Sequence, residues 1–105
     1  MSARQKTEAL VVGAGPVGLM AAAQLVRRNL SVRIVDAGWQ GTGMSYALGL
    51  HPASLDLFDE LGLADAVLDA GYRVDRIALY EGGARRETLD LTGLGCKHPF
   101  LTILP

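Results

Sequence analysis

The stretch that decides the fold is Leu10-Val-Val-Gly-Ala-Gly-Pro-Val-Gly18, close to the N-terminus. The apolar run over residues 9–12 predicts a strand buried on both faces, as in a parallel sheet. The glycines that follow have the spacing Gly-x-Gly-x-x-Gly, which is typical of a tight turn that connects a strand directly to a helix. In this pattern Gly13 permits the tight turn, Gly15 lets phosphates approach the backbone, and Gly18 lets the helix pack on the strand.

A helix and a second strand are predicted after the glycine turn. The helix spans residues 17–28, and Pro16 suits its start because a proline lacks only an N–H that would have no partner there. Its apolar positions can share one face, and these are Leu19, Ala22, Ala23 and Val26. Residues 31–36 predict the second strand. Strand, helix and strand in this length make a βαβ unit with parallel strands.

Asp36 indicates that the turn binds a dinucleotide. It ends the second strand, near the spacing at which a carboxylate meets the ribose hydroxyls. The helix N-terminus directs unpaired N–H groups and the positive end of its dipole toward the pyrophosphate. The charge of Asp36 disfavours a 2′-phosphate and therefore NADP, which leaves FAD and NAD open. The alternative is a tight strand–helix turn that binds nothing.

The rest of the chain predicts two short helices and a hairpin. Residues 37–49 contain four glycines and indicate a loop. The expected elements after this loop are a helix from Pro52 to Gly62, a second helix over 63–70, paired strands over 76–81 and 85–91 joined by Gly82-Gly83, and a short strand near 100–104. The predicted fold class is therefore α/β.

Composition limits the partners and the compartment. The chain has 105 residues and a net charge of −1, with mixed signs that indicate neither a nucleic-acid nor a membrane partner. Cys96 is the only cysteine, so we expect no disulfide, a reducing cytoplasmic compartment, and a buried apolar role for this side chain. His51 and His98 have no carboxylate at ligand spacing, so no metal site is expected, and His51 is interpreted as structural. The glycine–proline cluster argues against a signal peptide.

Two stretches resemble one enzyme family. Val11-Val-Gly-Ala-Gly-Pro-Val-Gly-Leu19 resembles the N-terminus of the FAD-dependent aromatic hydroxylases, which are single-component flavin monooxygenases. Ala47–Leu63 is similar to the family's helix after the ribose acid, which ends in Leu-Gly-Leu. The resemblance implies that FAD is reduced by NAD(P)H, reacts with oxygen, and hydroxylates a small aromatic substrate.

The resemblance also implies a set of cofactor-binding residues. The pyrophosphate would lie against the glycine turn and the ribose against the end of the second strand. The residues so implied are Gly13, Gly15, Pro16, Val17, Gly18, Asp36, Ala37 and Tyr46. Tyr46 takes a place near the cofactor where relatives often have arginine. No catalytic residue is assigned in this chain.

We expect an incomplete Rossmann-like βαβ FAD-binding fold, because the family's downstream Asp-Gly and Gly-Asp pairs are missing from the sequence. Residues 1–71 would be the N-terminal part of the FAD-binding domain, and residues 72–105 the start of a strand-rich substrate domain. Such a fragment would be inactive alone and would self-associate through unpaired strand edges. An NAD-dependent dehydrogenase fragment and a non-catalytic nucleotide-binding remnant are the alternatives.

Overall fold

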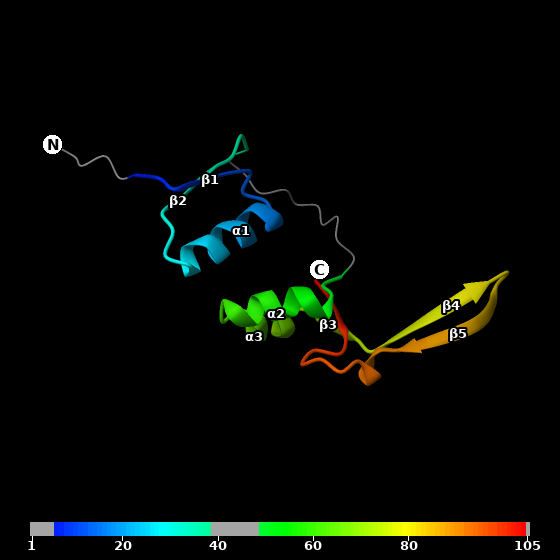
Figure 1. The fold of residues 1–105 in the computed structure, drawn as a ribbon. Helices are drawn as coiled ribbons and strands as arrows, with labels where there is room; N and C mark the ends of the chain where they lie inside the picture. The colour runs from blue at the N-terminus through cyan, green and yellow to red at the C-terminus, as the bar shows by residue number, and fades with distance from the viewer. Residues whose placement is uncertain (1–5, 39–48, 105) are drawn as a thin grey trace. The chain divides into compact units, whose positions relative to one another are not determined.

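The computed structural model describes residues 6–38 and 49–104, which belong to two compact units (Figure 1). The first unit contains β1 (Ala9–Val12), α1 (Pro16–Arg27) and β2 (Val32–Val35). The second unit contains every described element from α2 (Pro52–Glu60) to β6 (Leu101–Ile103). The described elements include both helices and strands, with a parallel βαβ unit at the start, which confirms the predicted α/β class.

The first unit is the predicted βαβ unit. Strands β1 and β2 are parallel, with Val11 opposite Ile34. Helix α1 begins at Pro16 and ends at Arg27, and the chain then reverses through Asn29 at φ +63°. Asparagine tolerates this left-handed conformation better than most residues, so it ends the helix and returns the chain to β2.

The buried face of α1 differs from the predicted one. Ala22 is only 5% exposed, whereas Leu19 and Val26 are 52% and 58% exposed. Gly18 and Leu25 are half-buried and lie on the side of Ala22, following the i, i+4, i+7 spacing of one helix face. The prediction is right for Ala22 and for Ala23, which is half-buried, and wrong for Leu19 and Val26. The helix approaches the sheet through Gly18 and Ala22, because small side chains let the two backbones lie close together.

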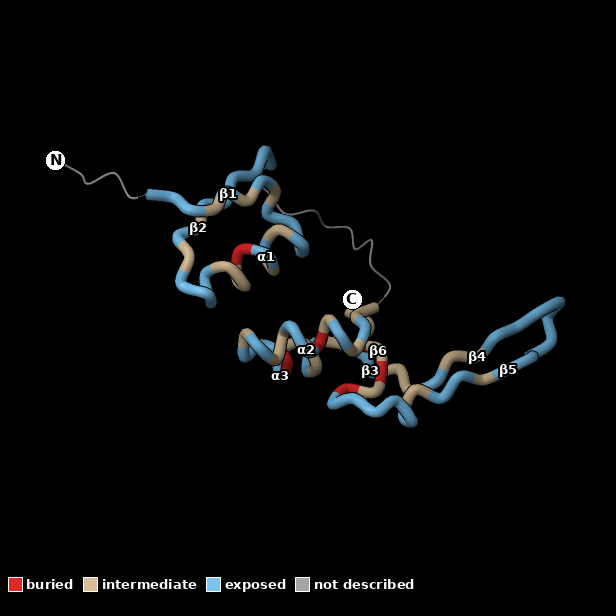
Figure 2. Tube along the Cα trace, viewed as in Figure 1, coloured by how far each residue is buried: buried red, intermediate tan, exposed pale blue. Residues whose placement is uncertain are grey.

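Burial of β1 on both faces was also a wrong expectation. Leu10 and Val12 are 59% and 78% exposed, while Val11, which points the other way, is half-buried. Because α1 lies against the Val11 side, only one face of the two-stranded sheet is covered within the described residues. Ala22 is the buried residue of α1, and Figure 2 shows the buried colour on α1 but not on β1 or β2.

The second unit is built around α2 and α3 (Ala64–Ala70). Helix α2 begins at Pro52 as predicted, and Gly62, at φ +70°, separates it from α3. The core is formed by Leu55, which is fully buried, together with Ala64 and Phe100 (Figure 2). The two predicted short helices are therefore confirmed, and they bury side chains against each other and against the segment before β6.

Strand β3 (Tyr72–Val74) was not predicted from the sequence. It pairs antiparallel with β6, with Arg73 opposite Thr102. Gly71 precedes it, and a Cβ there would lie 2.5 Å from the Thr102 Cγ2 atom. Three residues are too few to show an alternating pattern. The predicted short strand near residues 100–104 is confirmed as β6.

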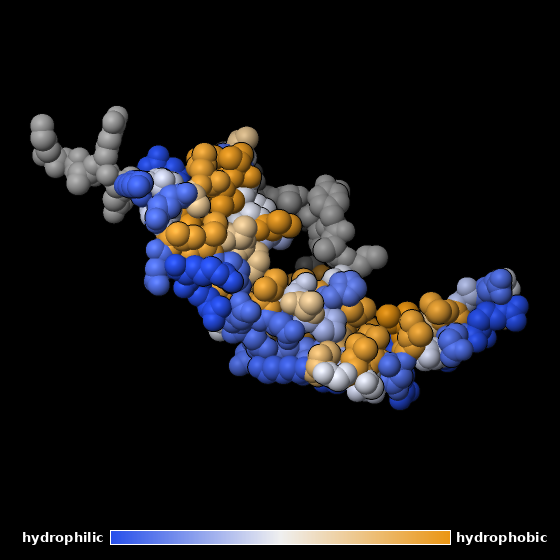
Figure 3. All heavy atoms as spheres, viewed as in Figure 1, coloured by the Kyte–Doolittle hydropathy of each residue, from blue (hydrophilic) through white to orange (hydrophobic). Residues whose placement is uncertain are grey.

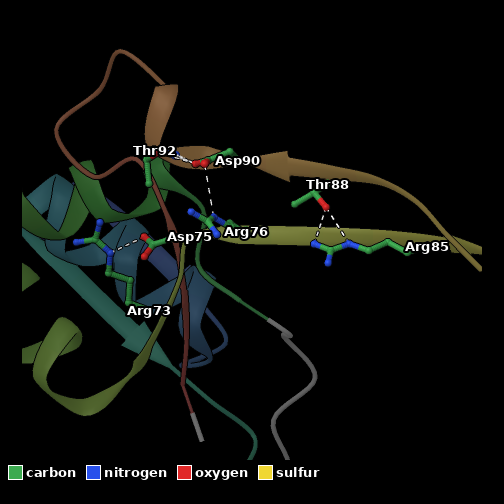
Figure 4. A network of polar contacts seen from close by, with 7 residues as sticks. All are labelled: Arg73, Asp75, Arg76, Arg85, Thr88, Asp90 and Thr92. Atoms are coloured by element: carbon green, nitrogen blue, oxygen red, sulfur yellow. Dashed lines mark hydrogen bonds and ion pairs between the residues drawn. The ribbon is translucent and has the colours of Figure 1, made fainter.

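The hairpin is formed by β4 (Arg76–Glu81) and β5 (Ala84–Asp90). Gly82 and Gly83 have φ values of +56° and +79°, the positive values that a tight two-residue hairpin turn requires. Figure 4 shows polar contacts along the hairpin. Arg76 Nε lies 3.5 Å from Asp90 Oδ2, and Arg85 Nε donates to Thr88 Oγ1 at 2.9 Å. The Thr92 amide donates to Asp90 Oδ1 at 2.9 Å. Thr92 belongs to the short 3₁₀ helix Leu91–Gly93.

Cys96 is exposed, contrary to the expected buried position. It follows Gly95 in a segment without helix or strand, where the backbone turns through a bond from the Cys96 amide to the Leu94 carbonyl of 2.9 Å. His98 and Phe100 are the side chains of this segment that enter the core. The buried positions of this segment are therefore occupied by two rings and not by the thiol.

Candidate functional site

Gly13 makes the turn out of β1. Its φ is +102°, a backbone conformation that residues other than glycine adopt only with strain. Its amide donates to the Val35 carbonyl at 2.7 Å, so the turn stays attached to β2 after the last paired residues of the two strands. The tight turn expected from the motif is therefore present, and glycine is required by the backbone conformation.

Gly18 allows α1 to pack closely on the turn. A Cβ at this position would lie 1.9 Å from the Gly13 carbonyl oxygen and 3.3 Å from Val11 Cγ1. A real Cβ never approaches a backbone oxygen so closely, and the backbone cannot move aside without loss of the turn. The close helix–strand packing assigned to Gly18 is thus a property of the fold itself.

Gly15 is different, because nothing in the fold requires it to be glycine. A Cβ there would have no atom within 4 Å, and its φ is not positive. Gly15 is the N-cap residue of α1, so this open space lies beside the N-terminus of the helix. The motif's expectation was that Gly15 leaves room for a ligand, and the space for one is present.

The N-terminus of α1 is suited to an anion. No side chain caps it, Pro16 takes the first helical position, and no acidic residue lies in the first turn. The amides of Val17 and Gly18 belong to the first-turn N–H groups that have no partner within a helix. Their partial positive charge adds to the helix dipole, so a phosphate next to Gly15 would be favoured.

Asp36 lies beside the turn and is held by two backbone amides. The Ala14 N–H donates to Oδ2 at 2.6 Å, and the Gly38 N–H donates to Oδ1 at 2.7 Å. These bonds, with Ala14 contributing most, keep the pKa of the Asp36 carboxyl below its usual value. The site therefore places a helix end that is suited to an anion beside a carboxylate that is ionised at neutral pH.

The structure brings most of the predicted site residues together. Gly13, Gly15, Pro16, Val17 and Gly18 form the turn and the start of α1, and Asp36 and Ala37 follow β2. Tyr46 lies outside the described residues, as does the start of the Ala47–Leu63 stretch. The bonds from Asp36 to the turn were missed, because the motif spacing indicates only that an acid lies nearby.

A second cluster was also missed by sequence reasoning. The Asp59 Oδ2 atom lies 2.5 Å from His98 Nε2 and 3.0 Å from Lys97 Nζ. A carboxylate oxygen of Asp56 lies within 4.8 Å of a carboxylate oxygen of Asp59 and a ring nitrogen of His98. These hydrogen bonds keep the pKa of Asp59 below its usual value, with His98 the larger cause. The Lys97 ammonium already supplies the positive charge beside Asp59, so the contacts amount to an ion-paired link between α2 and the segment before β6.

The comparisons with known proteins agree with this geometry. A family model described as an FAD binding domain matches residues 6–105. The chain belongs to the family of FAD-binding domains of aromatic monooxygenases. This confirms the family resemblance and FAD as the cofactor of the family, and the open space at Gly15, the uncapped helix and Asp36 fit that group.

Two curated relatives of this FAD-binding domain are monooxygenases. It is 34% identical over 99 residues to 6-methylpretetramide 4-monooxygenase of Streptomyces rimosus, covering 92% of this chain and 18% of that protein. It is 32% identical over 95 residues to pentachlorophenol 4-monooxygenase of Sphingobium chlorophenolicum, and the match covers 90% of this chain and 18% of that protein. The chain therefore spans about a fifth of the length of these relatives.

Solved structures share the fold of this FAD-binding domain. The p-nitrophenol 4-monooxygenase of Pseudomonas putida superposes with a TM-score of 0.82 at 23% identity, covering 93% of this chain and 26% of that one. The anhydrotetracycline hydroxylase of Streptomyces rimosus superposes with a TM-score of 0.76 at 24% identity, and the match covers 92% of this chain and 19% of that one. Among the described residues, no helix is both long and apolar enough to cross a membrane.

Proposed function

We propose that this chain binds the ADP part of FAD at its glycine turn. The pyrophosphate lies against Gly13, Gly15 and the N-terminus of α1, where Pro16, Val17 and Gly18 begin the helix. Asp36 and Ala37 lie beside the adenosine ribose. The observation that carries the proposal is the open space at Gly15, since the fold alone gives no reason for a glycine there. The uncapped helix end supports it.

We further propose that the chain serves as the N-terminal part of a longer monooxygenase. FAD supplies the oxygen-transfer chemistry when it is bound and reduced by NAD(P)H. This chain's own residues hold the nucleotide end of the cofactor, and Tyr46 lies near it. The substrate is a small aromatic compound, as the names of both curated relatives suggest. Residues 72–105 begin the substrate domain, the protein is cytoplasmic, and the 105-residue chain has no hydroxylase activity alone.

The test is calorimetric titration of the 105-residue chain with ADP, FAD and NAD. We expect ADP and FAD to bind, and Gly15→Ala to weaken both by at least about tenfold, or ~1.4 kcal/mol. The added methyl group meets no atom of residues 6–38 and 49–104 within 4 Å, so the circular dichroism spectrum should stay unchanged while the methyl blocks the phosphates. Gly95→Ala is the matched control, because a Cβ there also meets nothing within 4 Å.

Four results would contradict these two proposals. Wild-type chain that binds neither ADP nor FAD would favour the non-catalytic remnant. Tight NAD binding without FAD binding would favour the dehydrogenase fragment, since the Asp36 carboxylate suits the ribose of either dinucleotide. Equal affinity of Gly15→Ala and wild type would remove Gly15 from the site. NAD(P)H consumption with product formation by the chain alone would overturn the claim of inactivity.

A further inference from the structure

Two consecutive amides of the glycine turn are bonded to two consecutive residues at the end of β2. The Gly13 N–H donates to the Val35 carbonyl at 2.7 Å, and the Ala14 N–H donates to the Asp36 carboxylate at 2.6 Å. The first bond continues the parallel ladder between β1 and β2. The second continues it by one more step, with a side chain in place of a backbone carbonyl.

We infer that Asp36 is a positioning residue that holds the glycine turn in its binding conformation before any nucleotide arrives. This rests on the proposed function and deepens it, because it assigns Asp36 a task besides contact with the ribose. Without the carboxylate, Ala14 loses the only bond that ties its amide to β2 among the described residues. The chain between Gly13 and α1 then has no attachment to the neighbouring strand.

The carboxylate is itself held in place. Its second oxygen accepts the Gly38 N–H at 2.7 Å, an Asx-type turn that orients the side chain from its own backbone. A carboxylate offers about four acceptor positions, and these two bonds use about half of them. The remaining lone pairs are available to ribose hydroxyls, so positioning the turn and binding the ribose are compatible.

The two roles predict different effects of Asp36→Ala on the affinity for a nucleotide that lacks ribose hydroxyls. If Asp36 acts only through the ribose, Asp36→Ala leaves the affinity for 2′,3′-dideoxyadenosine diphosphate unchanged, or raises it by removing a negative charge near the phosphates. If Asp36 holds the turn, the same variant weakens this ligand, because the phosphate-binding amides are no longer in place. Titration with ADP and its dideoxy analogue separates these cases.

The experiment also measures amide hydrogen exchange of Ala14 by NMR in the chain without nucleotide. We expect exchange in Asp36→Ala at least about threefold faster than in wild type, as expected for loss of a charge-assisted hydrogen bond. Asp36→Glu, which retains the acid, should recover part of the protection. Asp36→Asn retains one acceptor oxygen and serves as the second variant should Asp36→Ala fail to fold.

Glu8→Ala is the matched control. Glu8 Oε2 accepts the Ser31 amide at 2.9 Å, a similar carboxylate-to-backbone bond at the opposite end of the same strand pair. It should change neither Ala14 exchange nor the affinity for the dideoxy nucleotide. Unchanged Ala14 exchange in both Asp36→Ala and Asp36→Asn would overturn the inference. Faster exchange in a chain that binds no ADP would support it while rejecting the proposed function.

Discussion

At the scale of single residues, the three motif glycines are glycine for three different physical reasons. Gly13 adopts a φ of +102°, Gly18 leaves no room for a Cβ, and Gly15 has open space around it. The first two are therefore explained by folding alone. The fold of the described residues gives no reason for a glycine at position 15, which makes Gly15 the most direct test of the proposed function.

This distinction gives a prediction about folding for Gly18. Gly18→Ala should destabilise the β1–α1–β2 unit by about 2–3 kcal/mol, because its Cβ would lie 1.9 Å from the Gly13 carbonyl oxygen and either the turn or the helix must move. The measurement is native-state amide exchange of α1 in Gly18→Ala and in Gly15→Ala. Gly15→Ala is the control and should leave α1 protection within about 0.5 kcal/mol of wild type. Equal protection in Gly18→Ala and Gly15→Ala would show that the helix does not pack against the turn as described.

At the scale of elements, the segments with a strong local pattern were predicted and those without one were not. Helices α1 and α2 begin at prolines, and the β4–β5 turn has two glycines of positive φ. Strand β3 has three residues, and its pairing with β6 connects positions about thirty residues apart. No local signal encodes such a pairing, so it is settled only when the chain closes on itself.

The link between α2 and the segment before β6 should weaken in acid. The His98 ring and the Lys97 ammonium hold the pKa of Asp59 below its usual value. A folded-state pKa below the unfolded one means that Asp59 contributes stability above about pH 4, which is lost as the pH falls through the folded pKa. Amide exchange of α2 between about pH 6 and pH 3 should therefore show protection decreasing toward the acid end.

Two variants isolate the contribution of Asp59. Asp59→Asn should be less protected than wild type near neutral pH but should lose less protection on acidification, because its side chain does not titrate. Asp69→Asn is the control on α3, since Asp69 is exposed and its carboxylate has no hydrogen bond or ion pair within residues 6–38 and 49–104. Identical acid profiles for Asp59→Asn and wild type would rule out the link as a source of stability.

At the scale of the whole molecule, the chain exposes many large apolar side chains. Figure 3 shows hydrophobic side chains at the surface of the β1–α1–β2 unit. Leu10, Val12 and Val35 share the face of the sheet opposite α1, and each is more than two-fifths exposed. Apolar faces and unpaired strand edges of this kind promote association between chains.

We therefore expect the isolated chain to self-associate through this face of the sheet. Sedimentation velocity over a dilution series should show a mass that rises with concentration. Val12→Lys should shift the chain toward monomer, because an ammonium cannot be buried between two apolar faces without a partner. Val17→Lys is the control, since Val17 is 84% exposed but lies on α1. A monomer at every concentration, or equal effects of the two variants, would contradict the expectation.

The sequence by itself determined the βαβ unit, the two short helices, the hairpin, and the motif that identified the family. These features depend on neighbours along the chain: glycine spacing, proline at helix starts, and apolar runs. Only the tertiary structure decided which face of α1 is buried, that Cys96 is exposed, that Asp59 meets His98, and that Asp36 bonds to Ala14. Each of these depends on residues distant in sequence, whose contacts are selected by packing and hydrogen bonding after the local elements have formed.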